Sequence, residues 1–387
     1  MALDDGLIEF MMLSCHPSKA LKHPKLLLMS TLKIVHVVEA LGGGVYTYFK
    51  NLTQVLCEAP DLEVTVIYSG NRDEINNDQV ASDFHPKTRL ICISMHREIR
   101  FKEDFKAFKA LKTTLKQIEP DVLHLHSSKA GILGRFAYLF SPRLKAKLFY
   151  TPHGFSFLRK DISSLKRHLF FSIEFLSQKL TGGTLIACGD TELRYAKKIG
   201  PALLVRNGIQ QLGLTNFEKQ HRPQIKCIGT LGRITYARNP AYFNQLALNH
   251  PELEFLWIGD GELRHQLTAP NITVTGWFNH YEQGLQKLEV LDLYLQTSLW
   301  EGLPIALLEA SAREIPIIAT NIIGNKDIIA SGKTGFLFDT ESDFDQALNK
   351  LDPESVRLEM GKAARKRTSI LFDSAVNFQK LIRLYHA

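Results

Sequence analysis

The sequence predicts an α/β protein made of two doubly wound parallel sheets. Short apolar runs, which are typical of strands buried on both faces, alternate with helical patterns along most of the chain. A second series of such runs begins after the polar stretch 210–224 and is about as long as the first. The chain has 387 residues, which is enough for two domains of ordinary size.

The composition excludes several other classes of protein. Apolar residues make up 45% of the chain and charged residues 22%, so a disordered, collagen-like or coiled-coil chain is excluded. No stretch reaches the ~18–20 apolar residues that a membrane-spanning helix needs. The five cysteines are scattered without a CxxC pair. This argues against a disulfide scaffold or a zinc site and favours the reducing cytoplasm.

The first domain is expected over residues 30–206. Its predicted strands are 32–38, 63–68, 121–126, 147–151, 184–188 and 202–205. A helical pattern over 45–58 follows the first strand, and the alternation predicts parallel βαβ units. Residues 1–29 show no period. We therefore expect a leader that is disordered or that precedes a translation start at Met29.

The second domain is expected over residues 207–365, followed by a C-terminal helix, 366–387, that packs back toward the first domain. The predicted strands of the second domain are 225–230, 253–258, 272–275, 292–296, 315–319 and 335–338. Doubly wound sheets bind ligands beyond the carboxyl ends of their strands. Two such domains facing each other predict a ligand site in the cleft between them.

The sharpest motif follows the strand 292–296. Glu301 and Glu309 are eight positions apart, with Gly302, Leu303 and Pro304 between them. Glycine permits a tight turn, and Pro304 suits the first position of a helix, whose free N–H groups bind phosphate. Carboxylates accept hydrogen bonds from sugar hydroxyls. Two glutamates on a solvated helix are the alternative interpretation, but the strand, turn and helix around them favour a binding site.

A second motif follows the first strand of the second domain. Arg233 and Arg238 are five positions apart and lie beside Gly232. The guanidinium group offers a fixed fork of donors that suits the oxygens of a diphosphate. Two ordinary surface arginines remain the alternative.

Three glycines, Gly42, Gly43 and Gly44, follow the first strand of the chain. A glycine-rich turn after a strand lets the backbone approach a phosphate or a sugar, although a tight turn explains it equally well. The pattern is neither GxGxxG nor a P-loop, which disfavours a Rossmann dehydrogenase and an ATP site.

Three histidines lie at or near the ends of neighbouring strands. His153 comes just after the strand 147–151, where it could donate to a substrate oxygen or take a proton. His126 is left open between a functional and a packing role, and His124 is expected to pack within its strand. The Asp-x-Asp pattern at 343–345 falls on a helical stretch far from any strand end, so no metal site is expected.

Together these motifs resemble the retaining nucleotide-sugar glycosyltransferases of the GT-B architecture, family 4. The resemblance runs from Lys33 to the C-terminus. Glu301 and Glu309 match the family's E-x7-E pattern, and Arg233 matches its diphosphate-binding arginine. The matches in the remaining loops are Gly42, Gly43, Gly44, His153 and the Asn-Gly-Ile segment 207–209.

The sequence departs from the family pattern in two places. Arg238 stands where the family usually has lysine, which keeps the charge but could alter the donor geometry or the rate. Ile323 and Gly324 replace a usual Gly-Gly pair, and Asp327 replaces a glutamate.

The resemblance implies a role for each matched residue. Arg233 and Arg238 would neutralise the leaving diphosphate, Glu301 would contact the transferred sugar, and Glu309 would hold the ribose. The other donor-binding positions would be Gly43, Gly44, Gly232, Trp277, Phe278, Gly302, Leu303 and Pro304. His153 would contact the sugar or assist at the reacting face, and His126 would lie on the acceptor side.

The resemblance also implies the partners. The donor would be a nucleotide sugar, of the UDP type, used without a metal or another cofactor. The acceptor would be a glycan or a lipid-linked sugar in capsule, exopolysaccharide or lipopolysaccharide assembly, and no nucleic acid is expected. A nucleotide-sugar 2-epimerase and an inactive binding subunit remain alternatives. Incubation with donor alone separates the epimerase, and an inactive subunit would be expected to lack Glu301, Glu309 or Arg233.

The positive charge is concentrated in the first domain. Residues 30–205 hold 25 Lys and Arg against 17 Asp and Glu, a net charge of +8, whereas the whole chain carries +7. Within the basic segment 97–116, Phe101, Phe105 and Phe108 recur at helical spacing. Such a helix either lies on the anionic inner face of the cell membrane or packs its aromatic stripe into the core.

Overall fold

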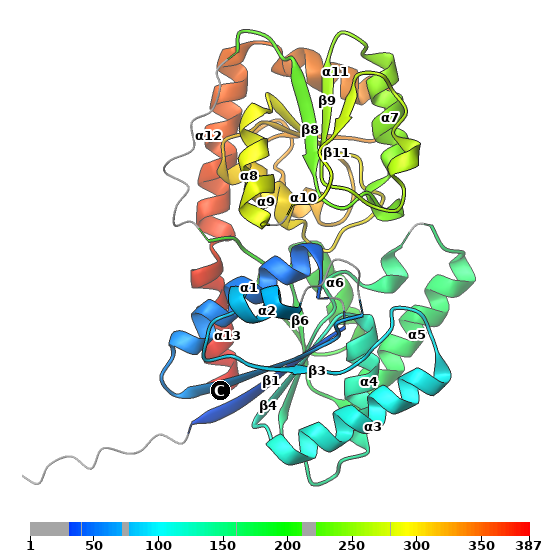
Figure 1. The fold of residues 1–387 in the computed structure, drawn as a ribbon, viewed down its shortest axis with the longest axis vertical. Helices are drawn as coiled ribbons and strands as arrows, with labels where there is room; N and C mark the ends of the chain where they lie inside the picture. The colour runs from blue at the N-terminus through cyan, green and yellow to red at the C-terminus, as the bar shows by residue number, and fades with distance from the viewer. Residues whose placement is uncertain (1–30, 40, 72–76, 160, 211–221, 279) are drawn as a thin grey trace, which may run out of the picture. The chain divides into compact units, whose positions relative to one another are not determined.

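The computed structural model describes residues 31–39, 41–71, 77–159, 161–210, 222–278 and 280–387 (Figure 1). The predicted leader, residues 1–29, lies outside the described residues. The strands fall into two sheets, one from each half of the chain, and all the strand pairs in both sheets are parallel.

The first sheet has seven strands in the order β3-β2-β1-β4-β5-β6-β7. Their bounds are β1 Leu32–Val38, β2 Leu62–Tyr68, β3 Arg89–Cys92, β4 Val122–His126, β5 Lys147–Thr151, β6 Thr184–Ala187 and β7 Ala202–Leu204. The central pair, β1 and β4, sets His36 opposite His124 in register.

The second sheet has six strands in the order β10-β9-β8-β11-β12-β13. Their bounds are β8 Cys227–Leu231, β9 Glu254–Ile258, β10 Ile272–Val274, β11 Leu293–Gln296, β12 Ile317–Thr320 and β13 Phe336–Phe338. When the strands of each sheet are numbered from that sheet's own first strand, both sheets begin with the order 3-2-1-4-5-6. In each sheet the order of the strands therefore reverses beside the first strand, between β1 and β4 in one sheet and between β8 and β11 in the other. Folds of this kind bind ligands at that reversal of strand order.

Helices connect the strands. Those of the first half are α1 Gly43–Glu58, α2 Asn77–Asp83, α3 Phe101–Ile118, α4 Ser128–Leu139, α5 Ser164–Thr181 and α6 Asp190–Ile199. Those of the second half are α7 Pro240–Asn249, α8 Tyr281–Gln286, α9 Ile305–Ala312, α10 Asn325–Ile328, α11 Glu341–Leu351, α12 Glu354–Leu371 and α13 Ser374–His386. Single 3₁₀ turns cover Ser156–Leu158, Tyr236–Arg238, Arg264–Gln266 and Lys287–Val290.

The last helix belongs to the core of the first sheet. Phe378, Leu381 and Tyr385 of α13 are fully buried in the same apolar cluster as side chains of β1, β2 and α1. Figure 1 shows α13 lying beside α1, which it contacts. The chain thus crosses between the two halves twice. The two crossings pair through the backbone, since the Ile209 N–H donates to the Phe372 carbonyl at 3.0 Å.

Two elements differ from the sequence prediction. The predicted strands omit β3, an edge strand of four residues that is only partly buried and begins with an arginine, so its apolar signal is weak. The predicted C-terminal helix, 366–387, covers the end of α12 and the whole of α13, so it is not one continuous helix. Asp373 interrupts it, because its side chain accepts a hydrogen bond from the Val376 N–H and caps α13.

Candidate functional site

A pocket of about 320 Å³ lies at the carboxyl ends of the central strands of both sheets. Its walls come from the loops after β1, β5, β8 and β11, together with Asn207 and Tyr281. The structure brings ten of the predicted site residues to this pocket. They are Gly43, Gly44, His153, Gly232, Arg233, Arg238, Glu301, Gly302, Leu303 and Pro304.

Gly302 lies where three loops meet. A Cβ atom on Gly302 would stand 2.7 Å from the carbonyl carbon and oxygen of His153 and 2.9 Å from the nitrogen of Gly154. A Cβ on Gly324 would stand 2.7 Å from the carbonyl oxygen of Gly302. Only glycine fits such an approach. The contact joins the loop after β5 in the first sheet to the loop after β11 in the second.

Helix α9 begins directly after this loop. Pro304 is the residue that precedes its first turn, one position earlier than the sequence predicts. Ile305 and Ala306, the first two residues of the helix, line the pocket. Because the N–H groups of a first helical turn have no partner within the helix, this end of α9 offers a partial positive charge to a ligand in the pocket.

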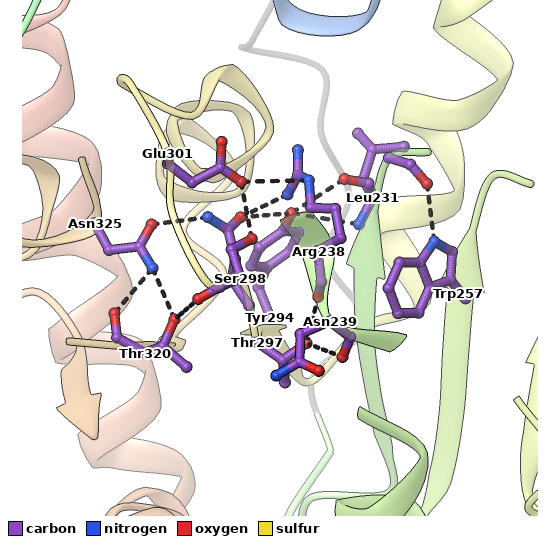
Figure 2. Close-up of polar contacts among 12 residues, drawn as sticks. Leu231, Arg238, Asn239, Trp257, Tyr294, Thr297, Ser298, Glu301, Thr320 and Asn325 are labelled. Atoms are coloured by element: carbon purple, nitrogen blue, oxygen red, sulfur yellow. Dashed lines mark hydrogen bonds and ion pairs between the residues drawn. The ribbon is translucent and has the colours of Figure 1, made fainter. Parts of the chain in front are cut away.

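Arg238 and Glu301 form the charged centre of the pocket, and Figure 2 shows how they are held. Arg238 Nε lies 3.4 Å from Glu301 Oε1, and Arg238 Nη1 donates to Oε1 of Gln296 at 2.9 Å. Ser298 Oγ donates to the same glutamate oxygen at 2.8 Å. Burial opposes the charge on Arg238, but Glu301 and Tyr294 outweigh it and raise the pKa of the guanidinium. Arg238 is therefore a fixed cation.

Gln296 connects this centre to the rest of the second sheet. Its side chain is buried, and its Nε2 donates to Asn325 Oδ1 at 2.8 Å. Asn325 Nδ2 donates to the Thr320 carbonyl at 2.9 Å, and Thr320 Oγ1 donates to the Ser298 carbonyl at 2.6 Å. The loop between β11 and α9 is thus tied to β12 and α10 (Figure 2). A buried and connected network of this kind fixes geometry.

Arg233 occupies the more open wall of the same pocket. Its Nη2 lies 3.2 Å from Oε2 of Glu262, and both side chains are partly exposed. The two arginines that the sequence singles out therefore line the same pocket, one of them held by a buried network and the other by a surface ion pair.

Glu309 lies behind the pocket wall. It is buried, and the Tyr281 hydroxyl donates to its two carboxylate oxygens at 2.6 and 2.5 Å. Burial raises the pKa of Glu309 to about 7, although the Tyr281 hydrogen bond, Arg313 and Arg238 oppose the shift. Tyr281 lines the pocket whereas Glu309 does not, so the tyrosine hydroxyl stands between this carboxylate and any ligand.

The raised pKa of Glu309 gives a prediction for stability. A carboxyl group whose pKa is higher in the folded state than in the unfolded state stabilises the protein below pH ~4.5, and this stabilisation is lost as the pH rises through about 7. We expect Glu309→Gln to gain stability relative to the natural protein between pH 5 and 8, by ~3 kcal/mol at most. Thermal unfolding of both proteins at the two pH values checks this. Glu262→Gln is the exposed control, and an unchanged difference would contradict the prediction.

Two buried carboxylates hold backbone groups beside the pocket, and one of them, Asp327, joins the two halves of the chain. Asp327 accepts hydrogen bonds from the backbone N–H of Thr191, at 3.0 Å, and from its hydroxyl. Glu192 accepts from the N–H groups of Gly154 at 2.7 Å and Cys188 at 2.8 Å. Burial raises the pKa of Glu192. Asp327, at a position where the sequence departs from the family pattern, thus binds the start of α6.

Two family profiles match this chain in succession. The profile described as Glycosyltransferase Family 4 matches residues 42–209, and the profile described as Glycosyl transferases group 1 matches residues 215–367. Between them they span most of the chain. The chain belongs to the group 1 glycosyltransferases. Its two doubly wound sheets give this glycosyltransferase the GT-B architecture.

Relatives of this glycosyltransferase are found in several bacteria. It is 27% identical to the UDP-Gal:alpha-D-GlcNAc-diphosphoundecaprenol alpha-1,3-galactosyltransferase of Escherichia coli, over 92% of this chain and 97% of that protein. It is 23% identical to the capsular polysaccharide biosynthesis glycosyltransferase CapM of Staphylococcus aureus, over 74% of this chain and 84% of that protein. The relatives include glycosyltransferases named for capsule and O-antigen synthesis.

Solved structures share the fold of this glycosyltransferase. The sucrose-phosphate synthase of Thermosynechococcus elongatus superimposes with a TM-score of 0.76 at 16% identity, covering 92% of this chain and 98% of that one. HepE of Anabaena, solved with UDP and glucose, superimposes with a TM-score of 0.70 at 14% identity, covering 91% and 99%.

The structure corrects the expectation that His126 contacts an acceptor. His126 is fully buried, and its two ring nitrogens lie 2.9 Å from His36 Nδ1 and 3.1 Å from His153 Nε2. His124 packs within the sheet of the glycosyltransferase as predicted, with its ring nitrogens bonded to Tyr385 and Thr151. Of these histidines, His153 lines the pocket.

Trp277 and Phe278 do not line the pocket of the glycosyltransferase. Trp277 is exposed, and Phe278 packs against the apolar cluster beneath α9. Conversely, sequence reasoning missed Tyr281 and Gln296. Both are single polar residues without a local pattern, and it is their contacts with Glu309 and Arg238 that reveal them.

In the part of the chain that the structure describes, one group of side chains lies close enough together to be considered as metal ligands. It consists of His36, His124 and His126, in the core of the first sheet and away from the pocket walls. None of the described helices is both long and apolar enough to cross a membrane.

Proposed function

We propose that this glycosyltransferase moves a hexosyl residue from a UDP-sugar to a lipid-linked or glycan acceptor, with retention of the anomeric configuration. The observation that carries the proposal is the convergence of Arg233, Arg238 and the start of α9 on one pocket. Two guanidinium groups and a helix N-terminus suit a diphosphate, and they supply positive charge without a metal ion.

The pocket residues divide the work of transfer. The bond between the sugar C1 and the diphosphate oxygen breaks, and the acceptor hydroxyl oxygen bonds to C1 on the same face, while the hydroxyl proton leaves with the diphosphate. Arg238 and Arg233 stabilise the charge that grows on the leaving group. Glu301, which Arg238 and Ser298 hold in place, contacts the transferred sugar.

The ribose contact requires a rearrangement. Glu309 is engaged by the hydroxyl of Tyr281. Ribose hydroxyls can bond this carboxylate once they displace the tyrosine, which already lines the pocket. Gly43 and Gly44 allow the loop after β1 to approach the sugar side of the donor.

The relatives support the setting of the reaction. The name of the E. coli relative gives a UDP-Gal donor and a diphosphoundecaprenol-linked acceptor. With that name as a guide, the purified full-length chain is incubated with UDP-galactose and a synthetic GlcNAc-diphosphate-lipid. UDP-glucose, UDP-GlcNAc and GDP-mannose serve as competing donors. Mass spectrometry identifies the product, and the proton coupling at its new anomeric centre reports the configuration.

Each arm of this experiment can contradict part of the proposal. Conversion of the donor without an acceptor would indicate the epimerase. An inverted anomeric centre would exclude retention, and loss of activity in EDTA with recovery on added Mg²⁺ or Mn²⁺ would exclude transfer without a metal. No transfer from any donor, with UDP still bound, would favour a binding subunit.

We also propose that the first half docks on an anionic membrane. Phe101 and Phe105 of α3 are 86% and 56% exposed, whereas Leu111 and Leu115 pack into the core. The start of the helix therefore exposes its aromatic side chains, whereas the leucines toward its end pack into the core. Helix α4 packs against both α3 and α5. Further exposed apolar side chains on α4 and α5, or directly after α4, are Phe136, Leu139, Phe140, Leu165, Leu169, Leu176 and Leu180. Apolar side chains flanked by lysines suit a lipid surface.

A charge variant tests this docking surface. Replacing Lys102, Lys106 and Lys109 with glutamine is expected to weaken binding to phosphatidylglycerol vesicles by about fivefold for each lysine removed. Turnover of a water-soluble acceptor should stay unchanged. The matched control replaces three lysines of the second half, Lys333, Lys362 and Lys366. Equal loss of vesicle binding in both variants would show that net charge, and not this surface, causes the attraction.

A further inference from the structure

A row of buried histidines leads from the pocket into the core of the first sheet. His153 Nε2 lies 3.1 Å from His126 Nδ1, and His126 Nε2 lies 2.9 Å from His36 Nδ1. His36 and His126 are fully buried. The His36 Nε2 atom, at the inner end of the row, is buried without a hydrogen-bond partner among the described residues. The row therefore has one end in the pocket and one end closed.

The three rings are neutral at physiological pH. Burial lowers the pKa of His36 and of His153 to about 3, and burial together with the neighbouring imidazoles holds the pKa of His126 well below its usual range. A neutral imidazole carries one N–H, so it donates through one nitrogen and accepts through the other. His126 must therefore donate to one neighbour and accept from the other.

This requirement leaves two arrangements of the row. In the inward arrangement, His153 donates to His126, which donates to His36, and an N–H on His36 Nε2 is left buried without a partner. In the outward arrangement, His36 donates to His126, which donates to His153. The unpartnered His36 Nε2 is then a bare acceptor, and the proton of His153 sits on Nδ1. Buried N–H groups without a partner are rarer than buried acceptors without one, so the outward arrangement is favoured.

We propose that His36 and His126 are positioning residues that hold His153 with its proton on Nδ1, so that it presents a hydrogen-bond donor to an oxygen of the transferred sugar. This inference rests on the proposed function and names the tautomer on which that function depends. The backbone from which this side chain extends is held as well. His153 has a φ of +52°, in the left-handed region, and its carbonyl abuts Gly302.

A metal ion at His36, His124 and His126 is the competing use of the same atoms. Their ligand atoms lie within 4.8 Å of one another. However, both nitrogens of His124 have partners, Tyr385 at 2.6 Å and Thr151 at 2.8 Å, and both nitrogens of His126 are used within the row. A metal would have to replace these bonds, whereas the row satisfies them.

Two variants of His36 test the proposal through three measurements, which are the ring spectra, the rate of transfer and the affinity for UDP. Long-range ¹H–¹⁵N spectra of the full-length protein identify the protonated nitrogen of each histidine ring, with His153→Gln used for assignment. His36→Phe removes the donor to His126. His36→Asn is the conservative variant, because its amide nitrogen can replace Nδ1 and donate to His126.

The expected results are specific. The natural protein and His36→Asn should both show His153 protonated at Nδ1, whereas His36→Phe should show a mixture or the reversed tautomer. Transfer from UDP-galactose should fall roughly tenfold in His36→Phe, the worth of about one hydrogen bond, and recover in His36→Asn. Affinity for UDP, which carries no sugar, should stay the same in both variants, although a merely structural defect would lower it.

Two outcomes would overturn the proposal. One is a natural protein with His153 protonated at Nε2. The other is a His36→Phe variant in which His153 keeps its tautomer and transfer keeps its rate. If the natural protein transfers no sugar at all, the proposed function fails, but the spectra of the natural protein and of His36→Asn still decide the state of the row.

Discussion

Replacing Arg238 with alanine is expected to lower kcat by ~10²–10³, the cost of removing one preorganised donor from a site where charge develops. The leaving diphosphate gains negative charge in the transition state, so kcat should fall by a larger factor than the affinity for the UDP-sugar. Steady-state kinetics with UDP-galactose and the lipid-linked acceptor, together with calorimetric titration of UDP, separate the two effects.

Three further arginine variants sharpen this prediction. Arg238→Lys keeps the charge but loses the fork that reaches Gln296 and Glu301 together, so an intermediate loss is expected. Arg233→Ala should cost less than Arg238→Ala, because Arg233 sits at the open wall in a surface ion pair. Arg264→Ala, an exposed arginine paired with Asp260, is the matched control. If Arg238→Ala lost no more activity than this control, Arg238 would not act on the leaving group.

Replacing Gly302 with alanine is expected to separate the loops that form the pocket. The new Cβ would meet the His153 carbonyl at 2.7 Å, and backbone atoms cannot rotate away as a side chain can. We expect a roughly 100-fold fall in kcat/KM, since displacing reacting groups by about 1 Å costs that much. The overpacking should also lower the free energy of unfolding by ~1–3 kcal/mol. Kinetics and urea unfolding measure the two effects.

Gly332→Ala is the control for this substitution. Gly332 has a φ of +77°, but nothing lies within 4 Å of the position its Cβ would take. This variant should lose some stability through backbone strain while its kcat/KM stays unchanged. If Gly302→Ala behaved in the same way, the contact between the loops after β5 and β11 would not shape the active pocket.

The fold was predictable because parallel strands are buried on both faces. Runs such as Leu32–Val38 and Lys147–Thr151 stand out as continuous apolar segments, and their bounds agree with the structure. The edge strand Arg89–Cys92 was not predicted, because its side chains are exposed or only partly buried and it lacks a continuous apolar signal. The break between α12 and α13 at Asp373 was not predicted. A capping aspartate within a helical pattern of apolar residues resembles any other polar position of that pattern.

The site was only partly predictable from local patterns. Glu301, Gly302 and Arg238 lie in loops directly after strands, where the sequence indicates both the turn and the chemistry. The burial of His126 could not be predicted from the sequence. A histidine at the end of a strand has the same sequence pattern whether its side chain faces a ligand or a neighbouring ring. Tyr281 and Gln296 matter through partners that are distant in the sequence, and such pairings become visible only in three dimensions.

The place of α13 bears on how the chain reaches its folded state. Phe378, Leu381 and Tyr385 complete the apolar cluster on one face of the first sheet, and in the chain they come after all the strands of the second sheet. The usual order, in which an N-terminal domain folds while the rest of the chain is still being made, is therefore unavailable to that face. Phe49 and its neighbours in this cluster therefore stay exposed to solvent until the second half has been synthesised. A nascent chain whose synthesis stops before α13 would expose this apolar surface to chaperones.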